Sequence, residues 1–266
     1  MQLKSIFKFQ ICALASISIL LMASTTVIAK DIHPYYYQLK IYHIGNATQQ
    51  ERMDRFLENA YLPALHRAGI KQVGVFKPLK TTVGDSLLYV LVPYSSFEKI
   101  EITATRLMQD QQYLLNGKDV IDAPYDNIPY LRQETILLSA FPQMPVPAIP
   151  QLKTPKAQRV YELRSYESPT EKYNESKVRM FNVGNEVAIF KRLGFNAVFY
   201  AEVLAGSHMP NLMYLTAFNN RTDREAHWKL FNEDPEWKAL LSKPEYQHNV
   251  SKADILFLHP ATYSDF

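Results

Sequence analysis

Two short stretches of the chain decide its fold, because they carry the same pattern of side chains. Residues 161–166 read YELRSY and residues 37–42 read YQLKIY, so tyrosine, a polar residue, leucine, a basic residue and tyrosine recur at matching places. Further along, LHRAGIKQVGVF at 65–76 matches FKRLGFNAVFYA at 190–201, with the aligned glycines 125 residues apart. A third pair at the same offset is YVLV at 89–92 and YLTA at 214–217. Blocks that recur in the same order predict a tandem duplication.

The first copy reads as strand, helix, strand, strand, helix, strand. After the strand at 36–42, apolar residues recur at helical spacing up to Gly69, and glycine commonly ends a helix. Strand-like segments follow at 73–79 and 87–94, joined by a turn at 83–85. The sequence SSFE at 95–98 is typical of a capping box, which predicts a second helix reaching about Leu115. Residues 135–140 are expected to form the last strand.

The second copy repeats this order. We expect one helix from 176 to 192 that ends at Gly194, followed by strands at 197–204 and 212–218. The sequence TDRE at 222–225 predicts another helix through a capping box. Asp234 before Pro235 predicts the N-terminus of a short helix that carries Trp237. Residues 254–258 complete the pattern as a strand.

A repeated βαββαβ unit is the ferredoxin-like arrangement, in which helices cover one face of an antiparallel sheet. The other face is then bare, and two such sheets can pack face to face into a barrel. The sequence therefore predicts an α+β fold of two tandem ferredoxin-like domains in an α/β-barrel arrangement. Two alternatives stay open, since the barrel can close within one chain or between two chains.

Two segments divide the chain into its expected parts. Residues 1–29 carry Lys4 and Lys8, an apolar run and small residues before Ala29, which is the layout of a secretory signal. Residues 142–156 are rich in proline, which favours an extended connector. The expected domains are therefore 30–141 and 157–266. We expect cleavage near Ala29 and export to the periplasm or the exterior, with no membrane association after cleavage.

Composition narrows the classes of function. The chain has 266 residues, 47% of them hydrophobic and 21% charged, which is typical of a globular protein. Its net charge of +3 does not favour a nucleic-acid partner. The one cysteine is Cys12, inside the predicted signal, so the mature chain has neither a disulfide nor a thiol nucleophile.

The second half resembles a known family. The stretch YELRSY, the helix that ends at Gly194, the strand pair after it and FNEDPEW at 231–237 resemble the NIPSNAP domain over nearly all of 157–266. The first half resembles a diverged copy without the Asp-Pro-x-Trp segment. The resemblance implies a dimeric α/β barrel of the ferredoxin-like kind, and hence a homodimer. It implies no single reaction, because the wider superfamily includes cofactor-independent monooxygenases, isomerase-like and degradative enzymes, and haem proteins.

The candidate site lies on the repeated strand. Side chains of a strand alternate, so Glu162, Arg164 and Tyr166 share one face, as Lys40 and Tyr42 do in the first half. If the apolar set faces the helices, this polar stripe faces the barrel interior, where it could orient a polar or anionic ligand. The alternative interpretation is a structural ion pair between the sheets.

Two histidines are further candidates, and the sequence lacks the common metal-binding and phosphate-binding motifs. His43 at the strand end and His227 on a helix are the remaining candidate ligand contacts, although a solvated histidine is the plainer interpretation. Because no histidine pair has metal-binding spacing and no phosphate-loop or G-x-S-x-G motif occurs, we predict neither a metal nor a cofactor. Three hypotheses remain: binding of a small, partly apolar ligand, a cofactor-independent monooxygenase or isomerase with a His or Glu base, and an oligomerisation module.

Overall fold

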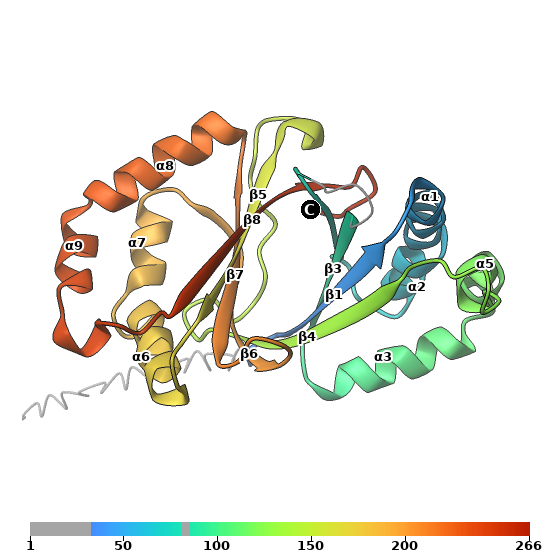
Figure 1. Ribbon diagram of the computed structural model, residues 1–266, viewed down its shortest axis with the longest axis horizontal. Coiled ribbons are helices and arrows are strands. Elements are labelled where there is room, and N and C mark those ends of the chain that lie inside the picture. Colours follow the sequence, from blue (N-terminus) through green and yellow to red (C-terminus); the bar gives the residue numbers. More distant parts are fainter. Residues whose placement is uncertain (1–32, 81–85) are drawn as a thin grey trace, which may run out of the picture. The chain divides into compact units, whose positions relative to one another are not determined.

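Eight antiparallel strands close into a single barrel, in the order β1-β3-β2-β8-β5-β7-β6-β4. Figure 1 shows these strands in the middle of the molecule, between two groups of helices. The computed structural model describes residues 33–80 and 86–266, so the predicted signal at 1–29 and the turn at 83–85 lie outside the described residues. The strands are β1 (Tyr36–Ile44), β2 (Gly74–Pro78), β3 (Ser86–Tyr94), β4 (Arg132–Ala140), β5 (Val160–Glu167), β6 (Asn196–Ala205), β7 (Asn211–Phe218) and β8 (Lys252–Pro260).

Helices connect the strands in the same order in both halves. The first half contains α1 (Ala47–Phe56), the π-helical turn η1 (Leu57–Tyr61), α2 (Leu62–Arg67), α3 (Glu98–Gln109), α4 (Gln111–Asn116) and α5 (Lys118–Ile121). The second half contains η2 (Lys156–Gln158), α6 (Glu171–Asn182), α7 (Glu186–Arg192), α8 (Arg221–Glu233), α9 (Pro235–Leu241) and η3 (Pro244–Tyr246). None of these described helices is long and apolar enough to cross a membrane.

The barrel closes within one chain. Each half contributes four strands in equivalent order, β4-β1-β3-β2 and β8-β5-β7-β6, and the pairs β2–β8 and β4–β6 join them. The described residues belong to a single compact unit. One chain therefore supplies both sheets, and a second copy is not needed to complete the barrel.

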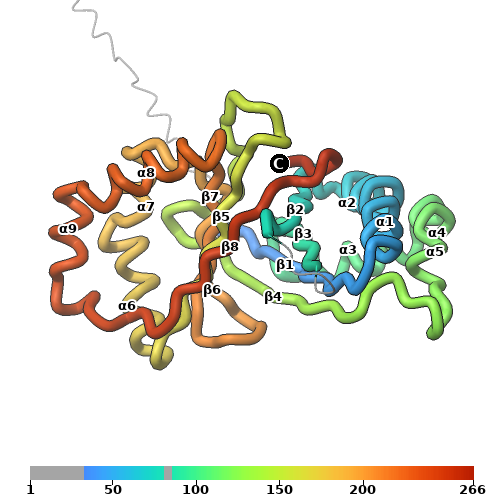
Figure 2. Tube along the Cα trace, turned by 45° about the horizontal axis from the view of Figure 1, so that its top comes forward, coloured from blue at the N-terminus to red at the C-terminus, as the bar shows by residue number. Residues whose placement is uncertain are grey.

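Three apolar clusters form the core. Side chains such as Tyr37, Leu39, Tyr161 and Leu163 fill the barrel interior. A second cluster lies between the first sheet and α1, η1 and α2, and a third lies between the second sheet and α6 to α9. Figure 2 shows the two helix groups on opposite sides of the barrel strands. Each sheet is thus buried on both faces, by the barrel interior and by its own helix layer.

Some helix ends lie where the local sequence predicts them, and others differ from the prediction. Gly69 and Gly194 have φ angles of 98° and 80°, as their predicted place after a helix requires. Asp234 caps α9 by accepting hydrogen bonds from the backbone N–H groups of Glu236 and Trp237. The single helix expected at 176–192 is divided into α6 and α7, because Asn185 adopts a left-handed φ of 68°. Asn220, rather than Thr222, caps α8.

Candidate functional site

The polar residues of β5 face the helix layer, and this orientation is the reverse of the expected one. Tyr161 and Leu163 belong to the cluster inside the barrel. Glu162, between them, bonds to Arg224 and Trp228 of α8. The physical reason is that large apolar side chains fill the closed barrel, whereas α8 supplies cationic and N–H donors that satisfy a buried carboxylate.

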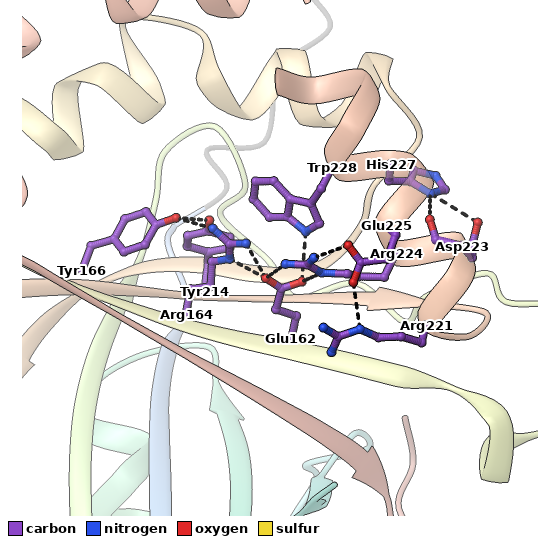
Figure 3. Close-up of polar contacts among 10 residues, drawn as sticks. All are labelled: Glu162, Arg164, Tyr166, Tyr214, Arg221, Asp223, Arg224, Glu225, His227 and Trp228. Atoms are coloured by element: carbon purple, nitrogen blue, oxygen red, sulfur yellow. Dashed lines mark hydrogen bonds and ion pairs between the residues drawn. The ribbon is translucent and has the colours of Figure 1, made fainter. Parts of the chain in front are cut away.

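Glu162 is the centre of a buried polar network (Figure 3). Its carboxylate is fully buried. It accepts hydrogen bonds from Arg164 Nε at 2.6 Å, Arg224 Nε at 2.7 Å and Nη2 at 2.9 Å, and Trp228 Nε1 at 2.9 Å. Burial by itself would raise the pKa of Glu162, but the two guanidinium groups outweigh it and hold the pKa below its usual value. Glu162 is therefore ionised at neutral pH.

This network holds the guanidinium of Arg164 in place. The guanidinium carbon lies 3.6 Å from the ring centroid of Trp228, in cation–π contact. Nη1 donates to the Tyr166 hydroxyl at 2.8 Å, and this hydroxyl lies 2.8 Å from that of Tyr214. Nη2 also pairs with Glu162 Oε1 at 2.5 Å, so that of the five N–H donors of the guanidinium each terminal nitrogen keeps one for a further acceptor.

A second buried ion pair lies nearby on the helices. Lys177 Nζ of α6 lies 3.0 Å from Glu186 Oε2 of α7, and both side chains are almost completely buried. Burial raises the pKa of Glu186 above its usual value, although Lys177 opposes the shift. Sequence reasoning missed this pair, because neither residue belongs to a recognisable motif and only the packing of α6 against α7 brings them together.

A cavity of about 360 Å³ separates these helices from the sheet. Arg164, Lys177 and Glu186 contribute its charged groups. Its aromatic walls include Tyr166, Phe190, Tyr214, Trp228, Phe231 and Trp237. An adjoining cavity of about 480 Å³ shares Arg164, Trp228 and Asn232 with it. This combination of aromatic walls and a few fixed charges is typical of a small-molecule site.

The cavity at the end of the barrel is smaller than this helix–sheet pocket. The core side chains of the barrel leave a cavity of about 230 Å³ at one end, beside Ile41, Glu134, Leu163 and Met213. Of the three β5 candidates, none lines this cavity, because all of them point outward into the helix layer. The expected position of the polar stripe, inside the barrel, is therefore corrected to the helix–sheet pocket.

The other predicted candidates do not line the helix–sheet pocket. Lys40 faces the helices of the first half, with its Nζ 5.5 Å from the ring centroid of Tyr61, and burial lowers the pKa of its ammonium. Tyr42 is buried in the same layer. His43 Nε2 lies 2.6 Å from Glu134 Oε1 at the end of β1. His227 Nδ1 lies 2.8 Å from the Asp223 carbonyl oxygen.

No cluster of three His, Cys, Asp or Glu side chains is placed to hold a metal within 33–80 and 86–266. His248 is the one histidine of the described chain that lines the helix–sheet pocket.

Comparison with known proteins gives a family for the second half. Residues 161–265 match the NIPSNAP family model, so the second half carries a NIPSNAP domain and the resemblance is confirmed there. A search of curated proteins finds no match. A NIPSNAP family protein from Agrobacterium tumefaciens is 22% identical, over 42% of this chain and 96% of that one, with a TM-score of 0.36.

Two solved structures are similar to both halves together. A protein provisionally named a monooxygenase from Lactobacillus acidophilus has a TM-score of 0.54 and 11% identity, and the match covers 86% of this chain and 94% of that one. A second protein with the same provisional name, from Fusobacterium nucleatum, has a TM-score of 0.54 and 8% identity, over 86% and 93% of the two chains. At such identities the similarity shows a shared fold and nothing about activity.

Proposed function

We propose that the chain binds a small aromatic molecule with one acidic group in the helix–sheet pocket of its second half. The observation that carries this proposal is the fixed guanidinium of Arg164, which lies in the wall of a cavity lined by aromatic rings. Its two unused N–H groups suit a carboxylate or an acidic phenol. The aromatic walls suit a flat, apolar ring.

Preorganisation of the pocket supports tight binding. Glu162 holds Arg164 from one side, Trp228 stacks on it, and Tyr166 accepts a third contact. A ligand therefore meets a guanidinium that is already oriented, and little side-chain entropy is lost on binding.

The test is a fluorescence titration, since both tryptophans of the chain, Trp228 and Trp237, line the pocket. We expect 1-naphthoate to change the tryptophan fluorescence of the full chain. Arg164→Gln is expected to weaken binding at least tenfold, because the charge and the charge-assisted hydrogen bonds of the guanidinium are lost. Arg221→Gln is the matched control, because Arg221 lies on α8 but outside the pocket. Equal affinity of both variants for 1-naphthoate would refute the proposal.

A cofactor-independent enzyme in the same pocket is the second candidate. Glu186 favours it, because this buried carboxyl lines the pocket beside Lys177, and its raised pKa suits a general base. His248 is the histidine that could take this role instead. Conversion of a bound aromatic acid, measured by oxygen uptake and product analysis, would support the enzyme. Loss of this conversion in Glu186→Gln would identify Glu186 as the base. Retention of the ligand without conversion supports a binding protein.

Three further expectations accompany this function. We propose that the halves arose by duplication, which the shared order of strands and helices supports. We also propose that the chain is exported after cleavage near Ala29, and N-terminal sequencing of the secreted or periplasmic protein tests this. The homodimer expected from the resemblance stays a prediction. If the chain proves to be an oligomerisation module instead, it will bind no small molecule in the pocket.

A further inference from the structure

A second cavity lies in the first half, well apart in sequence from the NIPSNAP domain. It is a groove of about 620 Å³ between the end of α2, the end of β3 and one face of α3. The α3 face carries Lys99, Ile102, Thr103 and Arg106, whose spacing places them on one side of the helix. Lys71, after the end of α2, also lines the groove.

The charges of this groove are unbalanced. Lys71, Lys99 and Arg106 line it, and no carboxylate does. Lys99 Nζ donates to Ser95 Oγ at 2.7 Å, and Arg106 Nη1 donates to the Ala68 carbonyl oxygen at 3.3 Å. Within the described residues, none of the three cations forms an ion pair with an acidic side chain. Three unneutralised cations in one concavity attract an anion.

The second half shows what the first half lacks. Arg224 follows Lys99 by 125 residues, the same offset as between Gly69 and Gly194, so the two cations occupy equivalent positions in the two halves. In the second half, Glu162 neutralises Arg224. In the repeated strand, Gln38 occupies the place of Glu162, so the first half has no matching acid. At the same offset, Thr103 occupies the place of Trp228, whose indole packs between the helices and the sheet of the second half.

The groove also has an apolar part. Ile70, Pro93 and Ile102 line it together with Tyr94, and Ile102 is 46% exposed to solvent. An exposed isoleucine beside unpaired cations suits a ligand with an apolar portion and an anionic end. We propose that this groove is a second binding site, for a small amphiphilic organic anion such as a carboxylate on an aliphatic chain.

The test is isothermal titration calorimetry of the full chain with octanoate. We expect one binding event that Lys99→Gln/Arg106→Gln weakens by about tenfold, because two of three nearby charges are lost. The matched control is Lys172→Gln/Lys238→Gln, which removes two exposed cations of the second half and should leave the affinity unchanged. Circular dichroism checks that each variant is folded.

A second variant tests the groove without deleting its cations. Ile102→Glu places a carboxylate in the exposed wall, and we expect octanoate binding to fall by a similar factor. The neutral analogue 1-octanol should bind at least tenfold more weakly than octanoate. Equal binding of 1-octanol, or equal losses in the control pair, would overturn the proposal.

An octanoate titration followed by tryptophan fluorescence separates this site from the helix–sheet pocket. Octanoate in the groove should leave the fluorescence of Trp228 and Trp237 unchanged, and Arg164→Gln should not weaken it. If octanoate instead alters tryptophan fluorescence and depends on Arg164, it occupies the pocket of the second half and the groove proposal is wrong. Failure of 1-naphthoate to bind the pocket would leave the octanoate result unaffected.

Discussion

Replacement of Glu162 by glutamine is expected to destabilise the second half strongly. Glu162 is fully buried and is the shared acceptor for Arg164, Arg224 and Trp228. Glutamine keeps the shape of the side chain but removes the charge and replaces one acceptor oxygen by an N–H₂ donor. The substitution therefore tests the network and not the packing.

The cost follows from the contacts. Oε1 accepts from Arg164 Nε and Arg224 Nη2, and Oε2 accepts from Arg224 Nε and Trp228 Nε1. Whichever oxygen becomes nitrogen, at least two donors then face a donor, at about 1–3 kcal/mol each. Breaking a buried ion pair costs about 3–5 kcal/mol. Water can reach the arginines, whose side chains are 10% and 12% exposed. We therefore expect a loss of about 3 kcal/mol in the free energy of unfolding.

The assay is urea unfolding at pH 7, followed by tryptophan fluorescence. Trp228 donates directly to Glu162, and Trp237 packs on Phe231 at a ring separation of 4.5 Å, so both report on this layer. Glu225→Gln is the control. Glu225 also pairs with Arg224, at 3.0 Å, but its side chain is 53% exposed. An exposed pair contributes at most about 1 kcal/mol.

A similar loss in the free energy of unfolding of the two variants would refute this prediction. A loss below about 1 kcal/mol for Glu162→Gln would mean that solvent compensates both arginines and that the network does not hold the second half together. Arg164 would then not be preorganised for a ligand.

Two further predictions concern the same molecule. The pKa of Glu162 is lower in the folded than in the unfolded chain. The ionised side chain therefore stabilises the fold above pH 4.5, the ordinary pKa of glutamate, and this stabilisation is lost as the pH falls through the folded-state pKa. The urea midpoint should thus fall less steeply below pH 4.5 for Glu162→Gln than for the parent chain. Gly194→Ala should lower the free energy of unfolding by about 1 kcal/mol, because Gly194 has a φ of 80°. The added Cβ itself would meet its nearest neighbour, His227 Nε2, at an ordinary 3.5 Å. Thermal unfolding measures the loss, and no change in stability would show that the backbone relaxes without strain.

Much of the fold could be predicted from local sequence. The matching stretches YQLKIY and YELRSY, together with Gly69 and Gly194, placed strands and helix ends correctly, because alternation, helical spacing and positive φ are local properties. The break at Asn185 was missed, since a continuous apolar periodicity does not reveal a single left-handed residue. Arg164 and Glu162 were found because i and i+2 on a strand always share a face.

The sequence by itself determined which side chains lie together on each strand and which elements follow one another. Only the tertiary structure decided that Glu162 points to α8 and not into the barrel, that Lys177 meets Glu186, and that two halves of one chain close the barrel. The physical reason is that alternation divides a strand into two faces without saying what covers each one. That choice depends on which packing leaves no buried charge unpaired, and the paired groups lie far apart in the chain.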